Sequence, residues 1–520
     1  VGETIKWSEL SKYDDITSNV TNEKLQQAVV TEITSTDEIR GNVGALSSNL
    51  TADQQIIIKD QTTLNNAAGN NNKFASGKDG VAVGLNVKHG QLTLNNGGEA
   101  GKVTLADGSK LAVNGNGKDT ILTSISGDNA QTKLTSGNLI LKQASKLGDV
   151  ETAKDTSLVV QSGDLSIKST DSTLNGDLTI TKGNLTLSGD ISLNGNTTVT
   201  GNLASTGVVS FEKAVTKVTG DASINKSKIS NGAQLIVDGK LSLSKAADLL
   251  LVGSYDEDNN SAGYLQANKV VLSKGTLMLD PDYNSPSSVA VITKFEDHAT
   301  SGQFSGDAGY ADGNLIVGQN SALFIGVDTK KEGLASAKEF LSQYQKANGA
   351  LDVENKGYGA IAYVNDKVAI SKNGFLLVDT QATSAKLLDD DGNIITSEFA
   401  NYKKAVGSVT PNAYLGKNTA LVISDNILED GAAVHFDTTN AAINVADPSA
   451  RVLLDGNGFT NGNREFTLFT DNGNTQTDTK GVMIVGNDLR VETVNGLMFL
   501  TYEAGKETTA QELQLDTVRA

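Results

Sequence analysis

The feature that most limits how this chain can fold is a glycine at every sixth position from Gly183 to Gly207. Between the glycines, apolar and hydroxyl residues alternate, as in Leu185-Thr-Leu187 and Ile191-Ser-Leu193. This alternation predicts β-strands that bury one face, and a glycine at each boundary leaves room for a sharp corner. Strands of about four residues joined by two-residue corners are typical of a β-helix.

Looser copies of the same pattern lie on both sides of this segment. Each begins with a glycine and continues with alternating apolar residues, and they start at Gly90, Gly137, Gly163, Gly232, Gly239 and Gly275. A short period sustained over such a length marks a solenoid in which each coil buries its face against its neighbours. We therefore predict an all-β fold, a parallel β-helix (β-solenoid) with about 22 residues per coil.

A longer repeat and three helical patterns follow from the same reading. Segments 315–328, 368–379 and 413–425 each contain a strand, a polar turn with Asn and a second strand, so we expect them to be equivalent coils. Apolar residues at helical spacing predict short helical insertions at about 331–348, ended by Gly349, and at about 396–406. A third pattern at 21–33 predicts an N-terminal helix that caps the first coil.

The composition excludes several classes of protein. The 520 residues include no cysteine, which excludes a disulfide scaffold, a thiolate zinc site and a cysteine enzyme. The formal net charge is −18, and the chain lacks the positive field that nucleic acids require. We expect no nucleic acid, anionic membrane or acidic polysaccharide as a partner. Only 5% of residues are aromatic and 53 are glycine, which favours a thin repeated core over a thick one.

Candidate catalytic and metal residues are few. The three histidines lie far apart in the sequence, and no Gly-Asp-Ser-Gly nucleophile turn occurs, so we predict no catalytic residues, no cofactor and no enzyme activity. Carboxylates cluster at 256–258, at 280 and 282, and at 389–391. Asp256, Asp258 and Asn260 place oxygen ligands at alternating positions, as calcium loops do, but Ser261 replaces the glycine of such loops. A solvated loop is the alternative there.

Four aromatic residues in the predicted insertions are candidate binding protrusions. They are Phe340 and Tyr344 in the first insertion, and Phe399 and Tyr402 in the second. The alternative is that both insertions simply cover the side of the coils, and the sequence leaves the two possibilities open.

The Gly-Asn-Leu-Thr-Leu-Ser coils, the absence of cysteine and the acidic Asn- and Thr-rich composition resemble the passenger domain of a monomeric (type V secretion) autotransporter adhesin of the self-associating, AIDA-like group. The resemblance covers most of residues 80–500. It implies a right-handed β-helix exported through a C-terminal outer-membrane barrel. The strands of such a barrel are not found here, so we expect a chain that is not itself inserted in a membrane.

We expect four parts on this basis. They are an N-terminal cap with the first coils at 1–75, β-helix repeats at 76–320, coils with helical insertions at 321–450, and a C-terminal β-helix region that resembles the family's autochaperone at 451–520.

The resemblance implies an extracellular adhesin stalk on the bacterial cell surface. Its partner would be a host surface protein or glycan, or an identical passenger on a neighbouring cell, bound through a long polar face of Asn, Thr, Ser and Asp. Two alternatives stay open, namely a β-helix polysaccharide-active enzyme (a lyase or glycosidase) and a purely structural surface-layer protein. A single Trp and five Arg argue against the enzyme, because sugar-cleaving grooves use aromatic platforms and cationic groups.

Overall fold

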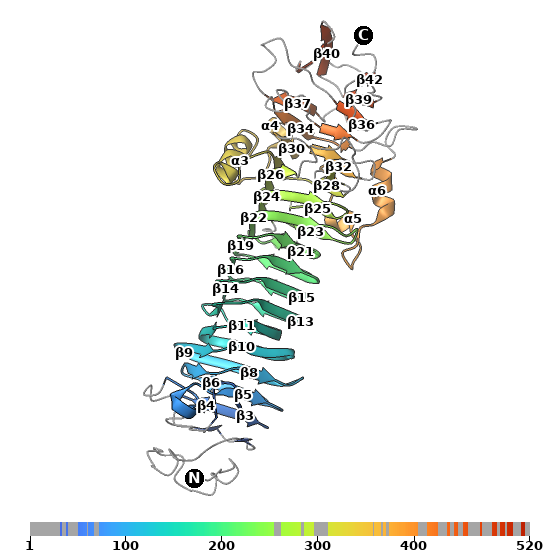
Figure 1. Ribbon diagram of the computed structural model, residues 1–520. Helices are drawn as coiled ribbons and strands as arrows, with labels where there is room; N and C mark the ends of the chain where they lie inside the picture. The colour runs from blue at the N-terminus through green and yellow to red at the C-terminus, as the bar shows by residue number, and fades with distance from the viewer. Residues whose placement is uncertain are drawn as a thin grey trace, which may run out of the picture. The chain divides into compact units, whose positions relative to one another are not determined.

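In the computed structural model the chain is mostly β, with 56% strand and 8% helix, so the prediction of a predominantly β fold is confirmed (Figure 1). The structure describes residues 50–59, 61–66, 72–253, 262–281, 285–295, 313–356, 358–365, 374–403 and 413–424. Outside these ranges it describes only the backbone of short strands at 32–33, 38–39, 310–311 and 368–370 and between 434 and 514.

The chain divides into two compact units. Unit 1 comprises Val1–Ser210 and Ala214–Gly220, and unit 2 comprises Phe211–Lys213 and Asp221–Ala520. The two units are described separately below.

Unit 1 contains three series of parallel strands, here called ladders A, B and C. Ladder A consists of β1 (Glu32–Ile33), β3 (Gln55–Ile58), β5 (Gly84–Val87), β8 (Val103–Leu105), the starts of β10 (Ile125–Leu141), β11 (Ser145–Thr152), β13 (Leu165–Leu174) and β15 (Leu185–Leu193), and β17 (Leu203–Ser205). Ladder B consists of β2 (Glu38–Ile39), β4 (Thr62–Asn65), β6 (Gln91–Asn95), the start of β9 (Lys110–Leu122), the middle of β10 and the ends of β11, β13 and β15. Ladder C consists of β7 (Gly98–Ala100), the ends of β9 and β10, β12 (Ser157–Val160), β14 (Asp177–Ile180), β16 (Thr197–Val199) and β19 (Val215–Val218).

The register of these ladders places like residues on one another. Leu165 pairs with Leu185 and Leu185 with Leu203, at separations of 20 and 18 residues. All three side chains are buried, at 0–1% exposure. The chain therefore returns to the same ladder after about three of the six-residue repeats. In this segment the return is shorter than the 22 residues expected from the sequence.

Glycines form columns where successive corners meet. A Cβ on Gly183, Gly201 or Gly220 would lie closer than 3.0 Å to the carbonyl oxygen of the glycine one return earlier, which is Gly163, Gly183 or Gly201 respectively. Gly201 needs no left-handed φ, so its requirement is space between two backbones rather than turn geometry. Glycines six residues apart thus lie at successive corners along the chain. The glycines that stack on one another in a column are 18–20 residues apart.

The Asn or Asp after each corner glycine bonds to the next return of the chain. The side-chain Oδ1 of Asp164 accepts from the backbone N–H of Asn184 at 2.8 Å, and Oδ1 of Asn184 accepts from that of Asn202 at 2.9 Å. Asp177 and Asn196 repeat the contact at 3.0 Å. These side chains satisfy corner amides that no strand partner reaches, which explains the Gly-Asn and Gly-Asp pairs without invoking a ligand.

Unit 2 contains ladders D, E and F. Ladder D consists of β21 (Lys226–Ser230), β23 (Leu249–Val252), β25 (Thr276–Leu279), β28 (Asn314–Val317), β32 (Phe375–Val378), β33 (Ala413–Leu415), β36 (Ala441–Val445) and β39 (Gly481–Val485). Ladder E consists of the starts of β22 (Gln234–Leu243), β24 (Tyr264–Leu272) and β26 (Ser288–Phe295), then β29 (Ser321–Ile325), β30 (Ala360–Val364), β34 (Thr419–Ser424) and β37 (Arg451–Asp455). Ladder F consists of β27 (Tyr310–Ala311), β31 (Val368–Ile370), β35 (Val434–Phe436) and β38 (Leu468–Thr470).

The C-terminal strands include antiparallel pairs. Strand β40 (Leu489–Val494) pairs with β41 (Leu497–Tyr502), and β42 (Gln511–Gln514) pairs with β39, both antiparallel.

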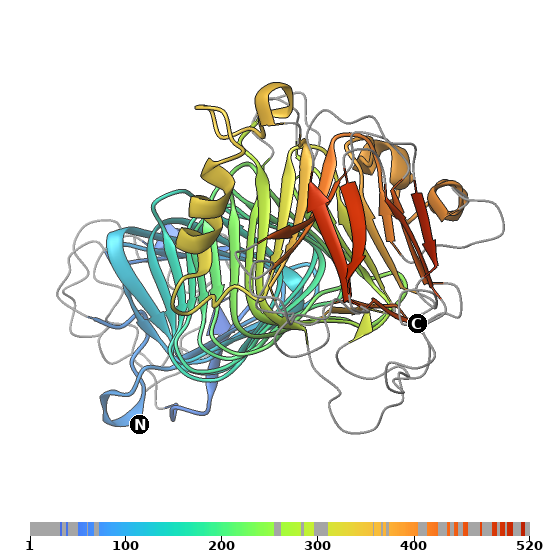
Figure 2. The same cartoon turned by 90° about the horizontal axis from the view of Figure 1, so that it is seen from above.

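Two crossovers interrupt unit 2. Strands β29 and β30 are parallel neighbours in ladder E, although residues 326–359 separate them in the chain, and β32 and β33 are parallel neighbours in ladder D across residues 379–412. Parallel neighbours joined directly need a crossover that passes over one face of the sheet. The first crossover contains α3 (Gly333–Ser342) and α4 (Val353–Lys356), and the second contains α5 (Ser384–Leu387) and α6 (Thr396–Lys403). Figures 1 and 2 show α3 and α6 on opposite sides of unit 2.

The crossovers explain a change in the sequence pattern. In unit 1 the strands alternate buried and partly exposed residues, whereas β23, β25 and β32 are buried at all four positions. Leu249, Leu251 and Met278 form one cluster with Leu387 and Phe399 of the second crossover. A sheet covered on both faces requires apolar residues at every strand position.

Both helical insertions form, and α3 is shorter than the sequence predicts. Helix α3 ends at Ser342 because Gln345 pairs with Leu351 in an antiparallel bridge, and Gly349, at φ 87°, lies in the turn that closes it. Helix α6 is described to Lys403. The predicted helix at 21–33 lies outside the described residues, apart from 32–33, which are strand.

The prediction of three equivalent coils is partly wrong. Segments 315–328 and 413–425 are equivalent, since both cross from ladder D to ladder E. Segment 368–379 is out of phase by one strand, because β31 belongs to ladder F and β32 to ladder D. The pattern of strand, polar turn and strand recurs at more than one corner, so the pattern alone does not show which two ladders a segment connects.

The glycine column yields a direct test. Gly201→Ala would force two stacked corners apart, and we expect it to lower the free energy of unfolding by about 1–3 kcal/mol. The measurement is the urea midpoint of the full chain. Gly333→Ala is the control, because the nearest atom to its added methyl, Gln266 Oε1, lies at 3.4 Å. An unchanged midpoint for Gly201→Ala would contradict the packing described here.

A second test concerns Asp280, which follows β25 and accepts the backbone N–H of Ser384 at 2.6 Å, fixing the second crossover to ladder D. Asp280 is 1% exposed, and its burial raises its pKa from 3.8 to about 6 although the hydrogen bonds from Ser384 lower it. The protonated carboxyl is therefore favoured in the folded state. Its stabilisation is present in full below pH 3.8 and is lost as the pH rises through about 6.

We expect Asp280→Asn, which stays neutral, to be more stable than the parent chain at pH 8 by up to about 3 kcal/mol, with little difference at pH 4. Urea midpoints at the two pH values measure this difference. Asp389→Asn should show the opposite effect and be less stable than the parent chain at pH 8. The reason is that backbone hydrogen bonds, the one from Asn393 most of all, lower the pKa of the exposed Asp389. Equal pH dependence of the parent and Asp280→Asn would contradict the role assigned to this carboxyl.

Candidate functional site

The calcium candidate Asp256, Asp258 and Asn260 lies outside the described residues. Within the part of the chain that the structure describes, no group of three or more His, Asp or Glu side chains is placed to hold a metal ion.

Two of the predicted carboxylate clusters are occupied by structural contacts. Asp389 accepts backbone N–H groups of Asp391 at 3.0 Å and Asn393 at 2.7 Å, which closes the turn between α5 and α6. Lys226 of β21 donates to the carbonyl of Asp391 and to Oδ1 of Asn393, so the same turn is attached to ladder D. Asp280 bonds to Ser384 as described above, and Asp282 lies outside the described residues.

Phe340 and Tyr344 belong to an aromatic cluster on the outer face of ladder E. The Phe340 ring centroid lies 5.6 Å from that of Phe324, 4.5 Å from that of Tyr363 and 5.2 Å from that of Tyr344, and Tyr344 lies 5.7 Å from Tyr358. Both residues are partly buried against the core cluster beneath α3. Most of their contacts hold the crossover to the strands.

Phe399 is a core residue. It is 6% exposed and packs with Leu249, Met278 and Leu377. Its ring is therefore buried under the second crossover rather than exposed on the surface. Tyr402 lies in α6, and its side chain is outside the described residues.

Some outward-facing polar side chains of unit 1 form hydrogen bonds within the chain, and others lie on the open surface. The Thr200 hydroxyl donates to the carbonyl of Thr181 at 2.6 Å, and that of Thr219 to the carbonyl of Thr200 at 2.5 Å, so these corner threonines bind neighbouring returns. Along ladder C the outward residues differ. Ile121, Ile140 and Val159 are stacked in register and partly exposed, and Thr179 and Thr198 continue the row.

A pocket of about 270 Å³ opens at the start of ladder C. It is lined by Asn66, Asn72, Asn96, Gly97, Gly98, Glu99, Lys118, Asp119 and Ile121. One wall is the turn between β6 and β7 together with the first residue of β7, where Asn96, Gly97 and Gly98 have positive φ values of 67°, 71° and 151°. Added atoms do not fit there, since a Cβ on Gly97 would lie 2.7 Å from the Asp119 carbonyl oxygen.

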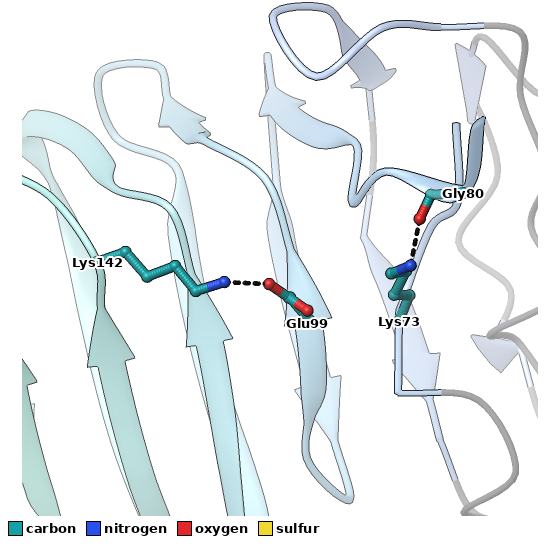
Figure 3. Close-up of polar contacts among 4 residues, drawn as sticks. All are labelled: Lys73, Gly80, Glu99 and Lys142. Atoms are coloured by element: carbon teal, nitrogen blue, oxygen red, sulfur yellow. Dashed lines mark hydrogen bonds and ion pairs between the residues drawn. The ribbon is translucent and has the colours of Figure 1, made fainter. Parts of the chain in front are cut away.

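Charged and amide groups are fixed around this pocket. Glu99 forms an ion pair with Lys142, which follows β10 (Figure 3). The same figure shows Lys73, which donates to the carbonyl of Gly80 and pairs with Glu99 through the backbone. Asp119 accepts the amide of Asn138 at 2.8 Å.

Asn66 is the unusual member of the lining. Its Nδ2 donates to the carbonyl of Gly97 at 2.8 Å, and the residue is 5% exposed. Its Oδ1 is buried and has no hydrogen-bond partner among the described residues. A buried acceptor without a donor costs about 1–3 kcal/mol, and residues 67–71, which directly follow Asn66, lie outside the described residues.

Sequence reasoning missed the pocket because its residues come from separate returns of the chain. The one local signal is Asn95-Asn-Gly-Gly98, where the alternation of β6 stops and three positive φ values follow. Such a run indicates an irregular corner but does not show what faces it.

Among the described residues, no helix has the length and apolar composition needed to cross a bilayer. The chain matches no family model, no curated protein and no solved structure with which it was compared.

Proposed function

We propose that the chain is a right-handed parallel β-helix that acts without enzyme activity as the stalk of a bacterial surface adhesin, in the manner of an autotransporter passenger. The observation that carries this proposal is the pairing of the strands between residues 165 and 218 with parallel strands 18–20 residues later, in three ladders. Three strands per return, with glycine and Asx at the corners, make one coil of a three-sided helix.

The outward row of ladder C is the surface proposed for self-association. Ile140, Val159, Thr179 and Thr198 repeat at the strand spacing of about 4.8 Å and lie in register. An identical chain presents the same spacing, so many weak contacts align at once, and their effects combine as in multivalent binding. The apolar members favour burial, and the threonines supply hydroxyl donors and acceptors.

A polysaccharide-active enzyme is the second candidate, and one observation favours it, namely that Glu99 and Asp119 line the same pocket. Glycosidases use paired carboxyl groups, one of which gives up a proton. Here Glu99 is paired with Lys142 and Asp119 accepts an amide hydrogen, which suits binding better than proton transfer. Release of reducing sugar by the purified chain would favour the enzyme. A structural surface-layer protein is the third candidate.

The adhesive role is tested by displaying the chain on non-clumping bacterial cells. We expect these cells to aggregate more than cells that display only the membrane anchor. Val159→Arg with Thr179→Arg should lower the clumped fraction by about tenfold, because unpaired charges buried at an interface cost several kcal/mol.

The matched control is Ser166→Arg with Thr186→Arg, which places the same charges on adjacent outward positions of ladder A. No clumping by the parent chain would contradict self-association. Equal loss in both variants would contradict the choice of ladder C.

A further inference from the structure

We propose that Asn116 is a site of self-modification in the folded chain, where the backbone nitrogen of Gly117 converts the side-chain amide to a carboxyl group. This reaction is separate from the adhesive role proposed above, and water is the only other reactant it needs. An asparagine followed by glycine is the most open to the reaction, because glycine has no Cβ to hinder its own nitrogen.

The reaction takes place in two steps. The Gly117 nitrogen loses its proton and attacks Cγ of Asn116, so that an N–Cγ bond forms, the Cγ–Nδ2 bond breaks, and the amide nitrogen takes up a proton and leaves as ammonia. Water then opens the cyclic imide at either of its carbonyl carbons. The product is aspartate, or the isomer in which the main chain runs through the side-chain carbon. The net change is one water consumed and one ammonia released.

Most Asn-Gly pairs among the described residues are protected from this reaction. A glycine N–H that donates to a carbonyl must first give up that hydrogen bond, and a buried one is shielded from the water that takes its proton. The protected glycines are Gly97, Gly115 and Gly176, which are buried, and Gly195 and Gly349, whose N–H groups donate to carbonyl oxygens at 3.1 and 2.9 Å. Of the described pairs, Asn116-Gly117 and Asn231-Gly232 have an exposed glycine.

These two pairs have nearly the same backbone turn. The φ values are 49° and 78° at Asn116 and Gly117, and 55° and 78° at Asn231 and Gly232. A Cβ on either glycine would meet nothing within 4 Å. The pairs therefore differ mainly in what surrounds the attacking nitrogen.

The attacking nitrogen is held in one pair and open in the other. The N–H of Gly232 donates to the carbonyl of Ala262 at 2.8 Å. Gly117 lies in the part of β9 that pairs with no other strand, and its N–H has no acceptor among the described residues. Asn116 itself is exposed, so both reacting groups are open to water.

The modification changes a row of amides that joins three returns of unit 1. Nδ2 of Asn96 donates to Oδ1 of Asn65, and Nδ2 of Asn116 donates to Oδ1 of Asn96 at 3.2 Å. A carboxylate at position 116 has no proton to donate and carries a negative charge. It therefore faces the Asn96 oxygen without a hydrogen bond, and the contact between these two corners is lost.

The test follows both asparagines in one preparation of the full chain, kept folded in mildly alkaline buffer. Peptide mass spectrometry measures the conversion of each amide to a carboxyl group, and an isoaspartate methyltransferase labels the isomer. We expect Asn116 to be converted about tenfold or more faster than Asn231, because the Gly232 nitrogen must first lose its hydrogen bond.

The matched control is the same chain unfolded in urea, where each asparagine keeps its glycine and loses its surroundings. The two rates should then become nearly equal. No conversion of Asn116 in the folded chain, or conversion no faster than that of Asn231, would overturn the proposal. A difference of the same size in urea would overturn it as well, because the difference would then come from the neighbouring sequence and not from the fold.

Discussion

Backbone hydrogen bonds between parallel strands are the interaction on which the described structure depends, and in residues 165–218 the paired strands are 18–20 residues apart. They hold successive strands at about 4.8 Å, and at several corners of unit 1 this spacing leaves no room for a Cβ. Gly183 and Gly201 meet that limit in one column. The side chains of Asp164 and Asn184 then accept hydrogen bonds from backbone N–H groups at the corners that form no hydrogen bond between strands. These corners thus require the glycine and Asx pairs, and the strands between them require only alternation.

The same pairing has a different consequence in unit 2, where the chain twice returns directly to a neighbouring strand of one ladder. A parallel neighbour is reached only by crossing over the sheet, so residues 326–359 and 379–412 cover outer faces of ladders E and D. The strands below them carry apolar residues on both faces, and the aromatic side chains of the insertions, Phe340 and Phe399 among them, become part of the core. Among the described residues, outward positions of unit 1 such as Ile140 and Val159 stay partly exposed.

The mostly β fold and both insertions could be predicted because each depends on local patterns. Alternation around Leu185 and Leu187 indicates a strand by itself, and helical spacing around Ala337 and Leu341 indicates α3. The stacking period could not be read from the six-residue spacing, because the residues that touch, such as Leu185 and Leu203, are joined through three intervening corners. The burial of Phe399 and the pocket around Asn66 were hidden for the same reason, since their contacts come from strands distant in sequence.

The measurement that tests this account most directly is engineered disulfide formation, which the absence of native cysteine makes unambiguous. Thr186 and Ala204 face outward at paired positions of neighbouring parallel strands, and adjacent strands bring Cα atoms into the range of about 4.4–6.8 Å that a disulfide spans. Thr186→Cys with Ala204→Cys should lose both free thiols on mild oxidation while the chain stays monomeric. Oxidation of Thr186→Cys with Ser192→Cys instead, as a six-residue antiparallel hairpin would give, would contradict the parallel pairing.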